Sequence, residues 1–177
     1  MKKVVITDYE YADVEKERKI ITDAGFYFEA LQCKNEQEVI DACRHADAVI
    51  VQYCTISRKV IEAMQHCKMV IKYGIGVNNI DSEAATEKGI YVCNVPDYGV
   101  DEVSNHAIAM LLALSKKLLV ITKSMRKGEW GYASIVPLHR MEGSTLGLVG
   151  LGRIPTLVAK KMANSGLKIL AFDTYMN

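Results

Sequence analysis

The stretch that decides the fold is G-L-V-G-L-G-R-I-P, residues 147–155. The apolar residues 146–149 predict a buried strand, and Gly150 permits a tight turn after it. Gly152 lets the backbone approach a pyrophosphate, and residues 153–165 form a plausible helix whose N-terminus would face that anion. The pattern indicates the first strand, turn and helix of a dinucleotide-binding domain.

An acidic residue follows at the distance that such a site requires. The apolar run 167–172 predicts the next strand, which ends at Asp173, 23 residues after Gly150. An acid at this place binds the hydroxyls of an adenosine ribose. A G-x-G motif alone is weak evidence, but with a strand before it, a helix after it and this acid it indicates a dinucleotide site. Asp173 favours NAD over NADP because a carboxylate repels a 2′-phosphate.

One position departs from the dinucleotide-binding fingerprint. The third glycine is expected at position 155, where the chain has Pro155. Glycine there allows the helix to pack closely on the strand, whereas proline adds volume and disfavours α geometry at Ile154. Two alternatives stay open: the helix starts slightly differently, or the affinity for the cofactor is reduced.

Strands and helices alternate along the first half of the chain. Apolar runs without polar alternation predict five strands that are buried on both faces, at residues 4–6, 26–31, 48–51, 69–71 and 90–95. Helices are predicted between them, at residues 14–24, 36–45, 58–66 and 82–88. This alternation predicts an α/β fold, with a flavodoxin-like parallel sheet over residues 1–98.

Residues 100–127 have a different pattern. Their apolar side chains recur mostly at spacings of three and four, which predicts one long amphipathic helix with a wide apolar face. Acidic residues in its first turn and basic residues in its last turn suit the helix dipole. The helix would open a second domain, residues 99–177, that contains the start of a doubly wound Rossmann sheet. Net charge changes at the same boundary, from −4 over residues 1–98 to +5 over residues 99–177.

A second glycine-containing loop follows the predicted strand 69–71. Consecutive backbone N–H groups around Gly74, Ile75 and Gly76 could bind a carboxylate. By itself this signal is weak, because a turn between a strand and a helix often needs glycine.

The composition is that of an ordinary globular protein. The 177 residues are 50% hydrophobic and 24% charged, with a net charge of +1, which gives no case for binding nucleic acid or a membrane surface. The apolar runs are shorter than the ~18 residues of a membrane span, and no signal-peptide core is present, so a cytoplasmic protein is expected. The five cysteines are odd in number and lack C-x-x-C spacing, so we expect free thiols and no metal site.

Together these motifs resemble the D-isomer-specific 2-hydroxyacid dehydrogenase family, which includes phosphoglycerate dehydrogenase. The matching stretches, in family order, are Y-G-I-G-V-N-N-I-D (73–81), G-I-Y-V-C-N-V-P (89–96), V-S-N-H-A-I-A-M-L-L-A-L (103–114), M-R-K-G-E-W (125–130) and G-S-T-L-G-L-V-G-L-G-R-I (143–154). They cover essentially the whole chain, which makes the resemblance far more specific than any single motif. Residues 93–103 also resemble the C-terminal-binding-protein branch.

The resemblance implies hydride transfer between NAD and the C2 atom of a 2-hydroxy or 2-oxo acid. It implies that the backbone of Gly74, Ile75 and Gly76 binds the substrate carboxylate. The positions that match the family's cofactor site are Val100, Ser104, Gly150, Gly152, Arg153, Ile154 and Asp173. Family members usually dimerise through the nucleotide-binding domain, so a homodimer held mainly by residues 100–140 is expected.

The resemblance assigns no catalytic residue within the chain. The family's catalytic arginine, glutamate and histidine would lie beyond Asn177, so residues 1–177 are expected to be inactive alone. His106, in the predicted long helix, and His139, in a loop, are not assigned as the missing base. Two alternatives stay open: an NAD-sensing binding module similar to the corepressor branch, and a degenerate fragment.

Overall fold

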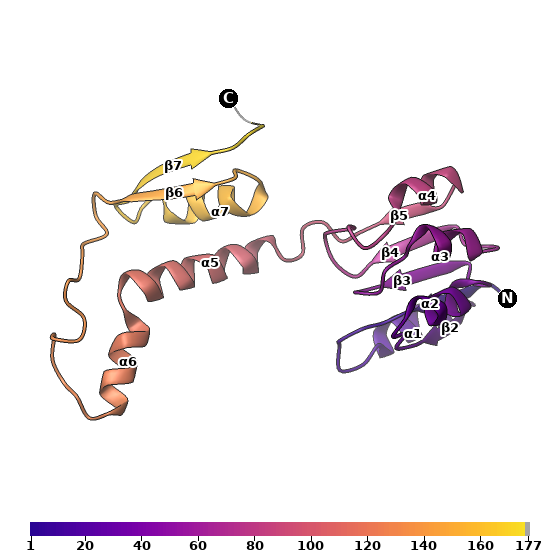
Figure 1. Ribbon diagram of the computed structural model, residues 1–177, viewed down its shortest axis with the longest axis horizontal. Helices are drawn as coiled ribbons and strands as arrows, with labels where there is room; N and C mark the ends of the chain where they lie inside the picture. The colour runs from indigo at the N-terminus through magenta and orange to yellow at the C-terminus, as the bar shows by residue number, and fades with distance from the viewer. Residues whose placement is uncertain (176–177) are drawn as a thin grey trace. The chain divides into compact units, whose positions relative to one another are not determined.

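The computed structural model describes residues 1–175. The chain divides into two compact units: unit 1 comprises Met1–Asp97, and unit 2 begins at Tyr98 (Figure 1). Each unit contains parallel strands and helices, so the predicted α/β class is confirmed. Within residues 1–175, no helix combines the length and the apolar character that crossing a membrane would need.

Unit 1 is built on a five-stranded sheet in which all neighbouring strands are parallel. In spatial order the strands are β2 (Tyr27–Ala30), β1 (Lys3–Ile6), β3 (Ala48–Val51), β4 (Met69–Lys72) and β5 (Tyr91–Cys93). This is the flavodoxin-like order. The carboxyl ends of β1, β3 and β4 therefore lie side by side, at the edge where open α/β sheets bind ligands.

Four helices connect these strands. They are α1 (Glu15–Asp23), α2 (Glu36–Cys43), α3 (Arg58–Ala63) and α4 (Ser82–Glu87). Side-chain oxygens of Asn35, Ser57 and Asp81 cap α2, α3 and α4 by accepting a hydrogen bond from a backbone N–H in the first turn. These caps fix where each helix begins after its loop.

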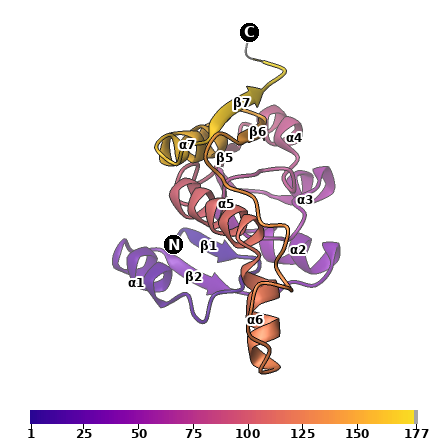
Figure 2. The same cartoon turned by 90° about the vertical axis from the view of Figure 1, so that its left-hand side faces the viewer.

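The two faces of the sheet in unit 1 are covered by different helices. Val5, Val49 and Val70 are fully buried in the larger core, together with apolar residues of α2, α3 and α4. Their neighbours Ile6 and Ile50 point to the opposite face, where they pack with Phe28 and with Ile21 of α1. Figure 2 shows α1 on one side of the sheet and α2, α3 and α4 on the other. Because helices cover both faces of this sheet, side chains on both faces of its strands are buried, which explains why the strands are continuously apolar.

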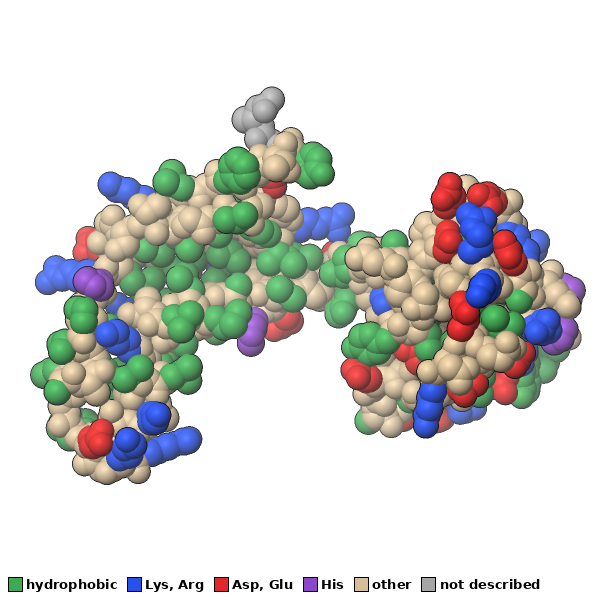
Figure 3. Space-filling view, viewed as in Figure 1, with side chains coloured by type: hydrophobic (Ala, Val, Ile, Leu, Met, Phe, Trp, Pro, Cys, Tyr) green, Lys and Arg blue, Asp and Glu red, His purple; other side chains and the backbone are tan. Residues whose placement is uncertain are grey.

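The described part of unit 2 contains one β-α-β motif with two helices before it. The elements are α5 (Val100–Ser115), α6 (Leu118–Arg126), β6 (Thr145–Val149), α7 (Arg153–Met162) and β7 (Lys168–Phe172). The strands β6 and β7 are parallel, and α5 packs against α7. Much of this unit's apolar surface is uncovered, as the hydrophobic side chains in Figure 3 show.

The prediction of one long helix over residues 100–127 is wrong. The chain leaves the helix at Lys116 and Lys117, and Lys117 has a φ of 52°, in the left-handed region. The Lys117 N–H bonds to the carbonyl of Leu114, which closes α5 with a tight turn. The apolar spacing continues through this point because both helices carry an apolar face, so periodicity alone could not reveal the break.

Candidate functional site

The glycine turn lies between β6 and α7, where the sequence predicts it. Gly150 has a φ of +90°, a conformation that L side chains rarely adopt, and its N–H donates to the carbonyl of Phe172 at 2.7 Å. Gly152 forms the N-cap of α7. A Cβ atom at Gly150 or Gly152 would meet nothing within 4 Å, so the space beside the turn is open. The turn therefore has room for an anion at the N-terminus of a ten-residue helix.

Asp173 lies directly beside this turn. Its Oδ2 accepts a hydrogen bond from the Leu151 N–H at 2.6 Å, and its Oδ1 accepts one from the Tyr175 N–H at 2.8 Å. The N–H groups of Tyr175 and Leu151 hold the pKa of Asp173 below its usual value. The structure thus brings a charged carboxylate at the end of β7 against the middle residue of the Gly150–Gly152 turn.

Pro155 does not disturb the start of α7. The helix begins at Arg153, and Pro155 is its third residue, where a backbone N–H has no partner within a helix. The Thr156 N–H bonds to the carbonyl of Gly152 at 3.0 Å, which closes the first turn. The expectation that the proline would move Ile154 out of α geometry is wrong, because this hydrogen-bonded turn outweighs a local preference.

The start of α5 is tied to α7 by one lysine. Val100 is the first residue of α5, and Ser104 is completely buried one turn later. The Lys161 ammonium donates to Oδ1 of Asp101 at 2.6 Å, to Oγ of Ser104 at 2.8 Å and to Oδ1 of Asn105 at 2.5 Å. The hydrogen bond from Lys161 lowers the pKa of Asp101. Ser104 therefore serves the packing of α5 on α7 in this structure.

The loop after β4 in unit 1 contains the three residues matched to the substrate carboxylate. Gly74 has a φ of +148°, its N–H bonds back to the Lys72 carbonyl at 2.9 Å, and its own carbonyl accepts from the Val95 N–H at 3.0 Å. The side-chain amide of Asn94 donates to the carbonyl of Ile75 at 2.7 Å. Ile75 and Gly76 are exposed, and within residues 1–175 their N–H groups donate to no protein acceptor. Two adjacent N–H groups are thus available to an anion.

A buried polar cluster next to this loop was missed by the sequence analysis. The Asp8 carboxylate, at the end of β1, accepts hydrogen bonds from the backbone N–H groups of Gln52, Tyr53 and Cys54, at 3.2, 2.5 and 3.2 Å. Burial acts to raise the pKa of Asp8, but these bonds and one from the Thr7 hydroxyl lower it below its usual value. The sequence signal that could have indicated this cluster is the Thr7-Asp8 pair directly after a buried strand.

No acid–base pair or metal site accompanies these elements in residues 1–175. None of the four histidines there forms an ion pair or hydrogen bond with a carboxylate. No group of three or more His, Cys, Asp or Glu in that range could hold a metal ion. All five cysteines are free thiols. The described residues thus offer two glycine turns, at Gly74–Gly76 and Gly150–Gly152, and the Asp173 carboxylate beside the second turn.

Comparison with known proteins identifies the class to which this fold and these turns belong. The model of the D-isomer specific 2-hydroxyacid dehydrogenase catalytic domain matches residues 4–171. The chain belongs to this family.

Individual relatives agree with this assignment. D-3-phosphoglycerate dehydrogenase of Methanocaldococcus jannaschii is 34% identical over 177 residues, which are 99% of this chain and 33% of that protein. The solved structure of NAD⁺-bound 3-phosphoglycerate dehydrogenase from Entamoeba histolytica is 26% identical, with a TM-score of 0.72, over 99% of this chain and 55% of that one. The acyclic imino acid reductase Bsp5, in complex with NADPH and D-Arg, is 26% identical, with a TM-score of 0.86, over 100% of this chain and 58% of that one. The chain spans 26–33% of the length of the curated relatives that it matches.

Proposed function

We propose that this chain is part of an NAD-dependent oxidoreductase that acts on the CH–OH group of a D-2-hydroxy acid. Family membership supports the reaction class. The observation that carries the proposal is the hydrogen bond from the Leu151 N–H to Asp173, because it holds a charged carboxylate against the glycine turn.

Each part of the glycine turn has a role in holding the dinucleotide. The N–H groups of Gly152 and Ile154, at the start of α7, would bind the pyrophosphate, and the open space beside the glycines would admit it. The Asp173 carboxylate would accept hydrogen bonds from the adenosine ribose hydroxyls. Its negative charge would repel a 2′-phosphate, so NAD is preferred over NADP.

In unit 1, the loop Gly74–Gly76 would hold the substrate by its carboxylate. The N–H groups of Ile75 and Gly76 would donate to the carboxylate oxygens and so orient C2 of the acid. Bound NAD would supply the hydride acceptor for oxidation of the alcohol at C2. Because none of the histidines in residues 1–175 is paired with a carboxylate, residues 1–177 alone are expected to bind ligands without turnover.

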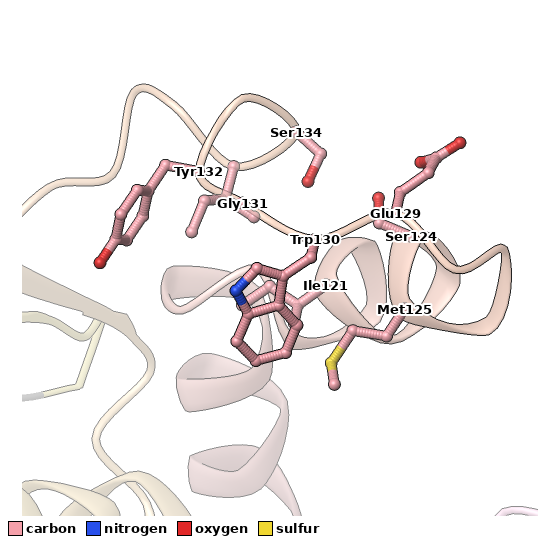
Figure 4. A pocket seen from close by; sticks show the side chains of 9 residues that line it. Ile121, Ser124, Met125, Glu129, Trp130, Gly131, Tyr132 and Ser134 are labelled. Carbon is pink, nitrogen blue, oxygen red and sulfur yellow. The ribbon is translucent and has the colours of Figure 1, made fainter.

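A specific feature of unit 2 favours association with a second copy. The segment that includes α6 and residues 129–135 carries a cavity of about 210 Å³ (Figure 4), with Ile121, Met125 and Trp130 among its lining residues. Trp130 and Tyr132 are 89% and 81% exposed. Large exposed aromatic side chains around an apolar cavity are typical of protein interfaces. The proposal therefore includes a homodimer held mainly by residues 100–140.

Calorimetric titration of residues 1–177 with NAD and NADP tests the cofactor site. Asp173→Ala should weaken NAD binding roughly tenfold or more, because it removes a charged acceptor for the ribose. It should also reduce the preference for NAD over NADP. Glu129→Ala removes an acid elsewhere in unit 2 and should leave both affinities unchanged.

Two results would contradict the cofactor site. One is equal affinity of the parent and Asp173→Ala for NAD. The other is the absence of NAD binding both by residues 1–177 and by any longer protein that contains them.

A further inference from the structure

The loop Gly74–Gly76 is bordered by exposed aromatic side chains. Tyr11, in the loop after β1, and Tyr53, in the loop after β3, are 50% and 62% exposed. The Tyr11 ring contacts the ring of Tyr73 edge to face, with the ring centroids 5.3 Å apart. The strands β1, β3 and β4 are neighbours, so these rings belong to one edge of the sheet. We call Tyr11, Tyr53 and Tyr73 the aromatic rim.

One lysine connects the aromatic rim to the loop. The Lys72 ammonium lies 5.8 Å from the centroid of the Tyr53 ring and donates to the backbone carbonyl of Gln52. A Cβ atom at Gly74 would lie 3.6 Å from Cε of Lys72, so the lysine stem runs along the glycine. This cation is therefore placed to pair with the same carboxylate that the loop N–H groups would bind.

The loops after β1, β3 and β4, which carry the aromatic rim and the loop Gly74–Gly76, contain a single basic residue, while Lys34 lies in the loop after β2 at the same edge. Lys72 is the only Lys or Arg in the segments 7–14, 52–57 and 72–81, all of which the structure describes. Once Lys72 pairs with the carboxylate of a substrate, these segments offer no positive charge to another anionic group on the same molecule.

The acidic residues at this edge also disfavour a second anionic group on the substrate. Oε2 of Glu10 accepts a hydrogen bond from the Tyr53 hydroxyl at 3.0 Å, so a carboxylate sits at the aromatic rim itself. Asp8 lies behind the loop that carries Tyr53, and hydrogen bonds keep it ionised. A phosphate or second carboxylate on the substrate would meet like charge here, and like charges at short range repel.

We propose that unit 1 selects a 2-hydroxy monocarboxylic acid whose side chain is uncharged and apolar or aromatic. The inference rests on the proposed function of the loop Gly74–Gly76. Lys72 and the loop N–H groups bind the carboxylate, while the rings of Tyr53 and Tyr11 contact the side chain. Glu10 excludes acids that carry a second negative charge. The preferred substrate thus differs from the phosphorylated acid in the names of the curated relatives.

The proposal is tested by titrating residues 1–177 with three 2-hydroxy acids: D-3-phenyllactate, D-lactate and 3-phospho-D-glycerate. Backbone amide shifts of Gly74 and Gly76 in NMR spectra report occupancy of the loop. We expect D-3-phenyllactate to bind at least about tenfold more tightly than 3-phospho-D-glycerate, with D-lactate between them.

Two variants assign the selectivity to particular side chains. Tyr53→Ala should weaken the binding of D-3-phenyllactate about three- to tenfold and that of D-lactate by less, since only D-3-phenyllactate loses the contact between the ring and its side chain. Its control is Tyr91→Ala, which removes another exposed ring, at the amino ends of the strands. Glu10→Gln keeps an acceptor for the Tyr53 hydroxyl and should tighten the binding of 3-phospho-D-glycerate severalfold more than that of D-3-phenyllactate. Glu62→Gln, on α3, is the matched control.

Three other results would contradict one or both proposals. Binding of 3-phospho-D-glycerate as tightly as D-3-phenyllactate would overturn the inference. So would the failure of all three acids to bind a chain that still binds NAD, and that result would leave the cofactor part of the proposed function intact. If neither the acids nor NAD bind, the proposed function fails as well.

Discussion

Unit 1 and unit 2 are both built from parallel strands and helices, but they bury their apolar side chains to different degrees. In unit 1, Val49, Val51 and Val70 in the central strands are fully buried. In the described part of unit 2, the buried hydrophobic residues are Val158 and Met162, both on α7.

The outer face of the β6–β7 sheet shows the difference most clearly. Val149, Leu170 and Phe172 there are 91%, 65% and 66% exposed. Parallel sheets are stable when both faces are covered. Unit 1 therefore has a core of its own, whereas unit 2 presents apolar surface that further protein would have to cover.

The largest expected effect is on the core of unit 1. Ile61→Ala removes a side chain of α3 that is 1% exposed and should lower the free energy of unfolding by about 2–5 kcal/mol. Val149→Ala, in unit 2, should change it by less than about 0.5 kcal/mol, because that side chain is already in solvent. Urea unfolding of residues 1–177, followed by circular dichroism, measures both. Equal losses for the two variants would break the comparison between the units.

The next effect concerns the buried carboxylate of unit 1. Asp8→Ala leaves three backbone N–H groups without their acceptor and should cost about 1–3 kcal/mol of unfolding free energy near neutral pH. The folded-state pKa of Asp8 is lowered, so its contribution is complete above the unfolded value of 3.8 and is lost as pH falls through the folded value.

The difference in stability between parent and Asp8→Ala should therefore be constant from pH 8 to 5 and shrink below 3.8. Unfolding curves recorded over this range provide the measurement. A difference that disappears as pH rises above 5 would show that Asp8 is not the group responsible.

The smallest effect is expected at Pro155 in unit 2. Because α7 starts normally with the proline in its first turn, Pro155→Gly should change the dissociation constant of NAD by less than about threefold. Calorimetry on the variant tests this. Tightening by tenfold would instead support the alternative that the proline impairs the cofactor turn.

Local patterns were sufficient for most of the secondary structure. The apolar runs predicted seven strands in total, and the structure has a strand at each of these places. The ends of the strands were predicted less accurately. A strand was predicted at residues 90–95, whereas β5 covers only Tyr91–Cys93. The next residue, Asn94, uses its side chain to bind the neighbouring loop, and an apolar pattern does not show such a contact.

The sequence by itself determined the parallel α/β architecture and the glycine turn. Buried parallel strands require continuous apolar runs, and a φ of +90° at Gly150 requires a residue without a Cβ atom. Both requirements act on a few consecutive residues, so they are visible in the sequence. The position of Asp173 relative to the turn follows from the same βαβ geometry.

Only the tertiary structure decided the surroundings of the substrate loop and the break between α5 and α6. Asp8 binds the N–H of Gln52, 44 residues away, because β1 and β3 are neighbours in the sheet. Tyr11, in the loop after β1, contacts Tyr73, in the loop after β4, because both strands lie next to β3 and end at the same edge of the sheet. Lys117 leaves the helix although no glycine or proline marks the place. Contacts between distant residues depend on strand order and packing, and no local pattern contains that information.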